Sequence, residues 1–296
     1  MNTALNADLH CHSVVSDGTL TPEELAQRAK TQGVALWALT DHDEVGGQSR
    51  AAAAAAAVGM DYLSGVEISV SFVGQTVHIV GLGIDPEDQQ LWLGLQKTRG
   101  GRAQRAREMS DGLARVGIHG AFEGALTYAG NHELISRTHF ARFLVETGVC
   151  KDTYEVFRKY LTEGKPGFVE HRWATLKEAV SWITQSGGMA IIAHPARYGF
   201  SANEEFALFT EFKNLGGQGV EVVTGSHSAA DAVEYAAVAL EFDLAASRGS
   251  DFHSPQESRT ELGSLPPLPD NLTPVWDLLK SRILRAPQPP LASTAD

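Results

Sequence analysis

The chain has 296 residues, of which 43% are hydrophobic and 20% are charged, and its formal net charge is −12 at pH 7. This composition excludes a disordered or fibrous protein, and the length suffices for one large domain or two ordinary ones. An acidic chain also lacks the positive charge of a general nucleic-acid binder, so any phosphate-rich ligand would need a local cationic site.

The sequence carries no sign of secretion or membrane insertion. Its two cysteines, Cys11 and Cys150, are too few for a disulfide framework, which fits a reducing compartment. The first residues show no basic and apolar signal pattern, and no apolar run approaches the roughly 18–20 residues that span a bilayer. We therefore expect a cytoplasmic enzyme with no membrane contact and no obligatory protein partner.

Strand-like and helix-like segments alternate along most of the chain. After a strand-like run over 7–12, Thr21, Pro22 and Glu24 form a capping box that opens a helix, and Gly33 ends it. The other predicted strands are 34–40, 62–73, 76–84, 189–194, 220–224 and 244–251, and the other predicted helices are 48–58, 176–185, 204–215 and 229–242. Repeated strand–helix units predict a mostly parallel sheet, open or closed.

The alternation stops near Gly100-Gly101 and resumes after about residue 165. The segment between is helical in pattern, which predicts a discontinuous α/β domain over 1–100 and 166–285 with an inserted helical cap domain over 101–165. A proline-rich tail over 286–296 is expected to be loose. Arginines at 99, 102, 105 and 107 precede Glu108 and Asp111, which favours a solvated helix face over a nucleic-acid track.

Metal-ligating residue types gather where the predicted strands end. Six of the eleven histidines lie there, in the motifs Asp8-Leu9-His10-Cys11-His12, Thr40-Asp41-His42-Asp43, Gly65-Val66-Glu67, Ala193-His194-Pro195 and Ser250-Asp251-Phe252-His253, with His78 on the strand paired to that of Glu67. In β/α folds the carboxyl ends of strands form the active face.

The spacing strengthens a metal-site hypothesis. His10 and His12 are two residues apart, so on a strand both imidazoles would lie on one face, and Asp251 and His253 repeat that spacing. A lone histidine at a strand end is usually structural, but five His/Asp/Glu clusters are more than one ion requires. Imidazole with carboxylate suits Mn, Fe or Zn, and two or three ions are the natural interpretation.

Taken together, these motifs resemble the PHP (polymerase and histidinol phosphatase) phosphoesterases over about residues 6–85 and 166–255. The resemblance implies a distorted seven-stranded β/α barrel and a trinuclear site, with Mn expected first and Fe or Zn as alternatives. One ion would bind His10, His12, Glu67 and Asp251, and a second would bind the bridging Glu67 with His78 and His194. The third would bind Asp17, His42 and His253.

The helical insertion resembles that of the PHP branch acting on nucleoside 3′,5′-bisphosphates and on 5′ ends of short RNA. By this resemblance Arg137, His139, Lys165 and Arg197 would contact phosphate, because guanidinium and ammonium groups pair with phosphate oxygens. Arg137 could instead pair with acids on a helix surface. His227 is a further candidate for the substrate pocket, with capping of the next helix as the alternative.

The predicted reaction is phosphomonoester hydrolysis, in which a hydroxide shared by closely spaced metals attacks phosphorus. Asp17, His194 and Asp251 are the residues we expect to be catalytic. A nucleoside 3′,5′-bisphosphate is the expected substrate, with short 5′-phosphorylated RNA as an additional one. The alternatives are a histidinol-phosphate-type phosphatase, a metal-dependent amidohydrolase, or a degenerate scaffold that would have lost ligands.

Overall fold

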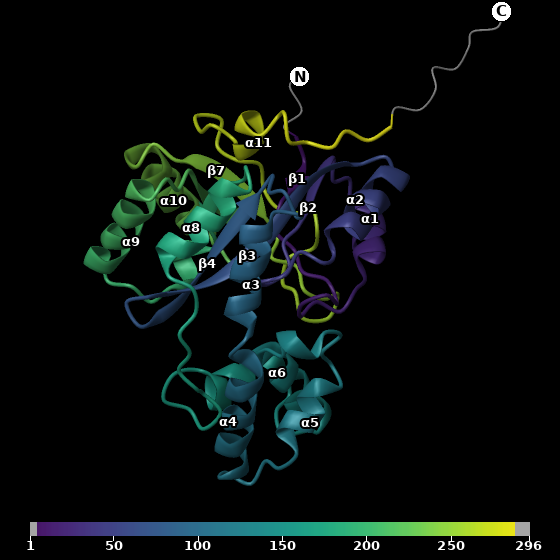
Figure 1. Cartoon of the computed structure of the whole chain (residues 1–296), viewed down its shortest axis with the longest axis vertical. Helices are drawn as coiled ribbons and strands as arrows, with labels where there is room; N and C mark the ends of the chain where they lie inside the picture. Colours follow the sequence, from purple (N-terminus) through teal and green to yellow (C-terminus); the bar gives the residue numbers. More distant parts are fainter. Residues whose placement is uncertain (1–4, 288–296) are drawn as a thin grey trace, which may run out of the picture.

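The computed structural model describes residues 5–287, and they form seven strands surrounded by helices (Figure 1). The strands lie side by side in chain order. Their bounds are β1(Ala7–Asp8), β2(Leu36–Leu39), β3(Asp61–Phe72), β4(Gln75–Leu82), β5(Met189–Ile192), β6(Gly219–Thr224) and β7(Ala245–Gly249). Within 5–287, no helix combines the length and apolar character needed to cross a membrane.

The sheet curls into a nearly closed barrel. Strands β1 to β3 are parallel, the hairpin strand β4 is antiparallel to both β3 and β5, and β5 to β7 are parallel again. The edges approach each other because Leu9 N–H donates to Arg248 O at 3.0 Å and Asp251 N–H donates to His10 O at 2.8 Å. This confirms the expected distorted seven-stranded β/α barrel.

Helices cover the outside of the barrel. The capping box at Thr21 opens the first of them as expected. The bounds are α1(Pro22–Thr31), α2(Gln48–Ala57), α3(Gln89–Arg99), α8(Leu176–Gln185), α9(Ala202–Asn214), α10(Ala229–Glu241) and α11(Val275–Leu278), with a 3-10 turn η3(Pro195–Arg197).

Side-chain alternation along the strands divides the apolar core into an inner and an outer part. On β2, Leu36 and Ala38 belong to the cluster inside the barrel, whereas Trp37 and Leu39 pack with residues of α1 and α2 on the outside. This is the period of two expected for a strand buried on both faces. Cys11, between His10 and His12, lies in the outer cluster and is fully buried.

The first strand is shorter than expected. Regular pairing covers only Ala7–Asp8, and the chain then continues as a bridge between Cys11 and Phe252. The prediction of a strand over 7–12 was therefore wrong at its end. His10 and His12 still lie close together, because β7 and the segment after it hold this stretch in place through backbone hydrogen bonds.

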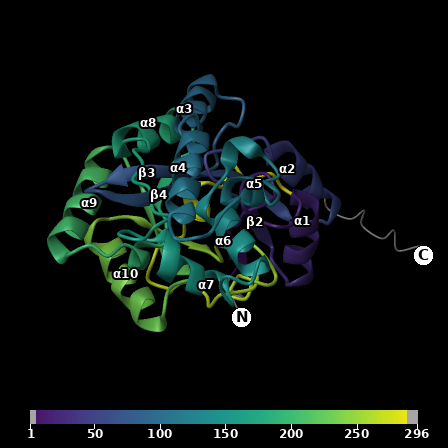
Figure 2. The ribbon, with the colours of Figure 1, turned by 90° about the horizontal axis from the view of Figure 1, so that it is seen from below.

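A group of short helices between β4 and β5 packs on a hydrophobic cluster of its own. Figure 1 shows these helices below the barrel, and Figure 2, from below, shows them in front of it. Their bounds are α4(Arg102–Ala114), α5(Ala121–Leu126), η1(His132–Leu134), α6(Arg137–Glu146), α7(Thr153–Val156) and the π-helical turn η2(Phe157–Leu161). Ion pairs from Arg142 to Glu257 and from Arg102 to Asp43 join them to loops of the barrel.

Candidate metal centre

The structure brings all nine predicted metal ligands together at one mouth of the barrel. Their side chains are between 0 and 20% exposed and supply four overlapping groups whose ligand atoms lie within 4.8 Å of one another. The groups are His12/Asp17/His42/His253, His10/Glu67/His194, His10/His12/Asp251 and His42/Glu67/His78. Most follow strand ends, but Glu67 and His78 lie within the long hairpin strands β3 and β4.

Glu67 is the centre of this cluster. Its side chain is completely buried, and five imidazoles approach its two oxygens. His42 Nδ1 lies 2.8 Å away, His78 Nδ1 2.9 Å and His194 Nε2 3.0 Å. Nitrogens of His10 and His12 each lie 3.3 Å away. A position shared by so many ligands fits the bridging role that the family resemblance implied.

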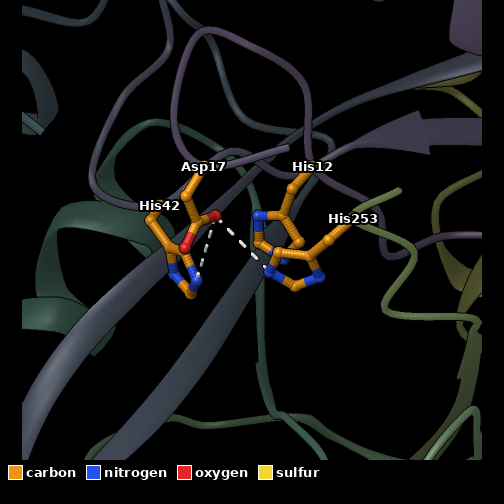
Figure 3. A group of neighbouring side chains, drawn as sticks. All are labelled: His12, Asp17, His42 and His253. Carbon is orange, nitrogen blue, oxygen red and sulfur yellow. Dashed lines mark ion pairs between the residues drawn. The ribbon is translucent and has the colours of Figure 1, made fainter. Parts of the chain in front are cut away.

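Asp17 gathers a second part of the cluster. Figure 3 shows its carboxylate facing His42 and His253, while His12 lies beside them. Asp17 Oδ1 lies 3.4 Å from His253 Nε2 and 3.8 Å from His42 Nε2. The His12 ring stacks between the other two imidazoles, with ring centroids 4.1 Å from His253 and 4.3 Å from His42.

The donor set fits divalent metal ions because the protein alone does not satisfy it. Asp17 Oδ1 and the Nδ1 atoms of His12 and His194 are buried without a hydrogen-bond partner. Buried polar atoms are ordinarily paired. Ring nitrogens also face one another, with His10 Nε2 3.2 Å from His12 Nε2. Cations between these atoms would supply partners for the unpaired atoms and separate the facing lone pairs. Imidazole together with carboxylate is suited to Mn, Fe or Zn.

Two of the histidines are held in the neutral form that metal ligation requires. Burial, followed by the neighbouring His253 and His42, lowers the pKa of His12 to about 3. Burial, followed by Arg197, lowers the pKa of His194 to about 4. Their ring nitrogens therefore keep lone pairs at neutral pH.

His42 behaves differently. Burial alone would lower its pKa, but Glu67 and Asp17 outweigh burial and raise the pKa to about 9. Burial likewise would raise the pKa of Glu67, but His78, His42 and His10 hold it well below its usual value. Without metal, then, His42 carries a proton that compensates part of the negative charge in the cluster.

Two ligands at strand ends have unusual backbone conformations. His194 has φ = 28° and Asp251 has φ = 55°, which lie in the left-handed region that residues other than glycine seldom adopt. Such strain persists only where surrounding contacts hold it, and it concentrates at functional sites. Gly249 permits the close approach of this segment, since an added Cβ would lie 2.3 Å from the Cβ of His10.

A buried carboxylate that the sequence motifs did not indicate supports the cluster. Glu221 on β6 lies 2.9 Å from His10 Nδ1, and its other oxygen accepts a hydrogen bond from His194 N–H at 2.7 Å. Carboxylates of this kind fix the orientation and tautomer of ligating histidines. The available signal was an acidic residue within the otherwise apolar strand Gly219–Thr224.

Asp41 and Asp43, which flank His42, do not orient histidines of the cluster as Glu221 does. Asp41 accepts hydrogen bonds from the hydroxyls of Ser13 and Ser16, whereas Asp43 pairs with Arg102. They stabilise the loops that carry the ligands, and neither is bonded to an imidazole.

A cavity of about 120 Å³ contains part of the cluster, because Asp17, His42, His78, His194, Asp251 and His253 line it. Four guanidinium groups line it, from Arg102 and Arg105 on α4, Arg137 on α6 and Arg197 on η3. Burial, with Arg137 and Arg102 nearby, lowers the pKa of Arg105 to about 9. A bound anion would relieve this repulsion, and guanidinium forks match phosphate oxygens.

Two of these arginines correct the sequence analysis. Arg102 and Arg105 are only 5 and 8% exposed, and Arg99 is 7% exposed, so the expected solvated helix face was wrong for these three and right only for Arg107, which is exposed. The barrel loops and Trp173 cover the buried arginines, with the Arg102 guanidinium 4.6 Å from the Trp173 ring centroid. A charge pattern on one helix cannot show that a distant segment packs over it.

The predicted substrate residues divide into two sets. Arg137 and Arg197 line the cationic cavity, whereas His139, Lys165 and His227 do not. His139 is fully buried, and its Nδ1 accepts a hydrogen bond from Ser136 N–H at the start of α6. Lys165 is exposed on the surface. His227 Nδ1 lies 3.0 Å from Val222 O, and the His227 ring stacks on the ring of Tyr235.

A barrel with nine candidate metal-ligand side chains at one mouth, some of them lining a cavity together with four arginines, is typical of a metal-dependent hydrolase of anionic substrates. Comparison with known proteins identifies the family of this hydrolase. A family model described as a PHP domain matches residues 8–160. The chain belongs to the PHP family and is a metal-dependent phosphoesterase.

Two relatives and two solved structures are similar over nearly the whole chain. A 3′,5′-nucleoside bisphosphate phosphatase from Chromobacterium violaceum is 52% identical, covering 95% of this chain and 98% of the relative. A 5′-3′ exoribonuclease from Haemophilus influenzae is 41% identical, covering 91% and 97%.

The first solved structure, described as an amidohydrolase from C. violaceum with bound sulfate and no metal, has a TM-score of 0.92 at 52% identity and covers 95% of this chain and 98% of its own. The second, assigned as a metal-dependent phosphoesterase from Bifidobacterium adolescentis, has a TM-score of 0.78 at 26% identity and covers 93% and 96%.

Proposed function

We propose that the protein hydrolyses the 3′-phosphate of nucleoside 3′,5′-bisphosphates such as 3′,5′-bisphosphoadenosine, leaving the 5′-monophosphate. The observation that carries this proposal is that four arginines and six of the candidate metal ligands line the same cavity. Four guanidinium groups are more than one phosphate needs, which favours a substrate with a second phosphate. The name of the C. violaceum relative gives independent support.

Three divalent ions are the proposed cofactors, with Mn first and Fe or Zn as alternatives. His10, His12, Glu67 and Asp251 would hold one ion, Glu67 with His78 and His194 a second, and Asp17, His42 and His253 the third. Bound ions would supply a water of lowered pKa as nucleophile and neutralise charge on the phosphoryl oxygens. Asp17, His194 and Asp251 are the proposed catalytic residues within this set.

The remaining chemistry comes from the chain itself. Arg102, Arg105, Arg137 and Arg197 would hold the 5′-phosphate, which positions the 3′-phosphorus at the cluster and makes the attack effectively intramolecular. Asp251 Oδ2 lies 2.6 Å from Arg197 Nη1, so one ion pair joins the cluster to the phosphate cavity.

The proposed domain arrangement follows from this division of labour. The barrel that carries the cluster would be the domain predicted over 1–100 and 166–285, of which residues 1–4 lie outside the described chain, and residues 101–165 would be the inserted cap that contributes Arg102, Arg105 and Arg137. The separate hydrophobic cluster of the inserted helices supports that division. Ser136 Oγ, at the start of α6, lies 3.2 Å from Asp17 Oδ2 and links the two parts at the site.

The test is phosphate release from 3′,5′-bisphosphoadenosine by Mn²⁺-reconstituted protein, with a chelator-treated sample and 5′-AMP as controls. We expect metal-dependent loss of one phosphate and no release from 5′-AMP. Arg137→Ala should raise KM for the bisphosphate, whereas Arg115→Ala, at the exposed end of α4, should not. Histidinol phosphate tests the second candidate. Its hydrolysis without that of the bisphosphate, with metals verified in place, would overturn the proposal.

An amidohydrolase is disfavoured by the central ligand. Such sites often use a carboxylated lysine as the bridge, whereas the bridging position here is Glu67. No lysine lines the cavity beside the cluster among residues 5–287. Four guanidinium groups also disfavour histidinol phosphate as the substrate, because that molecule carries a single phosphate and a cationic group.

A further inference from the structure

The hydrogen-bond ladder between β4 and β5 changes where it reaches the metal-ligand cluster. Regular antiparallel pairing ends with Ile79 opposite Ile192. One residue further along this register, His78 lies opposite Ala193, and Ala193 N–H donates to His78 O at 3.1 Å. Opposed residues that are joined in this way ordinarily exchange two such bonds. The second bond, from His78 N–H to Ala193 O, is replaced by bonds to a side chain.

That side chain belongs to Tyr198, which directly follows the turn η3. Its hydroxyl accepts a hydrogen bond from His78 N–H at 2.8 Å and donates one to Ala193 O, also at 2.8 Å. A phenolic hydroxyl can donate and accept at the same time. A direct bond would place the backbone nitrogen and oxygen about 2.9 Å apart, so an oxygen inserted between them holds the two strands farther apart at this pair.

Both partners of this hydroxyl adjoin a candidate metal ligand. His78 is itself such a candidate, and Ala193 O belongs to the same peptide group as His194 N–H. That N–H donates to Glu221 at 2.7 Å, so the peptide group is held at its oxygen by Tyr198 and at its nitrogen by Glu221. Such support is needed because His194 has φ = 28°, and a strained backbone persists only where surrounding contacts hold it.

The two histidines meet at one carboxylate oxygen. His78 Nδ1 lies 2.9 Å and His194 Nε2 lies 3.0 Å from Glu67 Oε1, and the two ring nitrogens are 3.3 Å apart. Metal–ligand distances are fixed to within about 0.2 Å. Closing the ladder by a fraction of the width of an oxygen atom would therefore move one histidine out of register with the other.

The ring of Tyr198 is held by its own packing. Its centroid lies 5.6 Å from that of His194 and 5.8 Å from that of Phe200, and Phe200 packs in turn on Phe72 of β3 at 5.9 Å. His78 and His194 line the cavity that contains part of the cluster, whereas Tyr198 does not. The tyrosine therefore acts through the two histidines and does not contact a substrate in that cavity.

We propose that Tyr198 is a positioning residue whose hydroxyl sets the spacing of His78 and His194, so that both bind one divalent ion together with Glu67. The inference rests on the proposed function, in which these three side chains hold the second of three ions. Tyr198 itself does not coordinate the ion. It fixes the backbone atoms from which the two imidazoles extend.

Tyr198→Phe is the decisive substitution, because it keeps the ring and its packing but removes the inserted oxygen. The ladder then either closes into a direct bond from His78 N–H to Ala193 O or leaves both groups unpaired. In each case the two histidines lose their present spacing. The other two proposed ions depend on His78 and His194 in neither case, so they should remain.

The test counts bound ions by equilibrium dialysis of the full chain against a series of Mn²⁺ concentrations, followed by metal analysis. At the Mn²⁺ concentration that just saturates three sites in the wild type, Tyr198→Phe should bind two ions. Its third ion should need about 10- to 100-fold more Mn²⁺, the range for loss of a group that orients a metal ligand. His78→Ala should lose the same ion, and Tyr198→Phe added to it should have little further effect, because two substitutions that act on one ion are not additive.

Tyr235→Phe is the matched control. Tyr235 is also buried, and its hydroxyl donates a hydrogen bond to Glu205 at 2.7 Å, away from the cluster. This variant should bind three ions at the wild-type concentration. Turnover of the bisphosphate by Tyr198→Phe should recover at high Mn²⁺ with an unchanged KM for the bisphosphate, since the tyrosine lies outside the lining of the cavity. Circular dichroism of the metal-free proteins reports the fold.

Three outcomes would overturn the inference. They are wild-type Mn²⁺ binding by Tyr198→Phe, equal weakening of all three ions, and loss of the metal-free fold in Tyr198→Phe. The last two would mean that the hydroxyl stabilises the barrel in general and does not set the spacing of two histidines. If the wild type binds no ion that His78→Ala removes, the inference fails together with the metal assignment. If the wild type binds three ions but releases no phosphate from the bisphosphate, the proposed substrate fails, while the ion count still decides the role of Tyr198.

Discussion

Glu221 provides the sharpest test of how the barrel prepares its ligands. One carboxylate oxygen lies 2.9 Å from His10 Nδ1 and the other accepts from His194 N–H at 2.7 Å, so both contacts need an acceptor. Glu221→Gln keeps the shape but replaces one acceptor with an NH₂ donor. If that donor faces His10 Nδ1, the imidazole proton must move to Nε2, the nitrogen aimed at Glu67 and Asp251. If it faces His194 N–H, two donors oppose each other.

The magnitude follows from these two contacts. Leaving a buried donor unpaired costs about 1–3 kcal/mol. Loss of a carboxylate that orients a ligating histidine lowers metal affinity or activity about 10- to 100-fold, which is about 1.4–2.7 kcal/mol. The two ranges agree, so Glu221→Gln should weaken Mn²⁺ binding by one to two orders of magnitude while the barrel stays folded.

Calorimetric Mn²⁺ titration, together with activity against Mn²⁺ concentration, measures this loss. Circular dichroism and the melting temperature of the metal-free protein report the fold. Glu205→Gln is the matched control, since Glu205 also accepts a hydrogen bond, from Tyr235 on the outer surface of the barrel, and lies away from the cluster. Wild-type Mn²⁺ affinity in folded Glu221→Gln would refute the orienting role.

Three further outcomes are expected. Gly249→Ala should lower the free energy of unfolding by about 1–3 kcal/mol in chemical denaturation, because the new Cβ would overlap His10. Gly199→Ala is the control, since no atom lies within 4 Å of its new Cβ, and it should change the free energy of unfolding by no more than about 0.5 kcal/mol. Equal effects of the two substitutions would contradict this packing argument. His194→Ala should abolish turnover with the circular dichroism spectrum retained, and near-normal activity with metal bound would disprove its assignment as a ligand. Because the pKa of His42 is raised to about 9, Mn²⁺ binding at pH 7 should release protons, and Mn²⁺ affinity should increase as the pH rises toward 9. Calorimetry in buffers of different ionisation enthalpy measures this proton release. Mn²⁺ binding without proton release would contradict the prediction that His42 is protonated in the metal-free protein.

Much of the fold could be predicted from the sequence because its signals are local. Capping at Thr21, the apolar run over 34–40 and the neighbouring strand-like runs over 62–73 and 76–84 each depend on residues a few positions apart. The end of β1 could not be predicted, since its pairing depends on residues near Arg248, more than 200 positions away. Local pattern indicates that a segment is a strand, whereas its partner sets where regular pairing stops.

The metal ligands could be predicted because their residue types are expensive to bury without a function. His10, His12 and Glu67 stand out in apolar surroundings, and spacing alone suggested a shared face. Glu221 carried the same signal, an acidic residue in an apolar strand, but it belongs to none of the motifs on which the prediction depended. Arg102 and Arg105 carried the opposite signal, because a run of charges on a helix ordinarily faces solvent.

The sequence by itself determined the class of fold through its strand–helix alternation, and its motifs determined the nine candidate ligands and the family through their resemblance to known proteins. Only the tertiary structure decided the rest of the site. It placed Glu67 at the centre, set Glu221 behind His10 and turned four arginines toward the cluster, while it buried His139 and left Lys165 at the surface. Residue type and spacing select what can bind a phosphate or a metal. Packing between segments far apart in the chain decides which of those groups share one cavity.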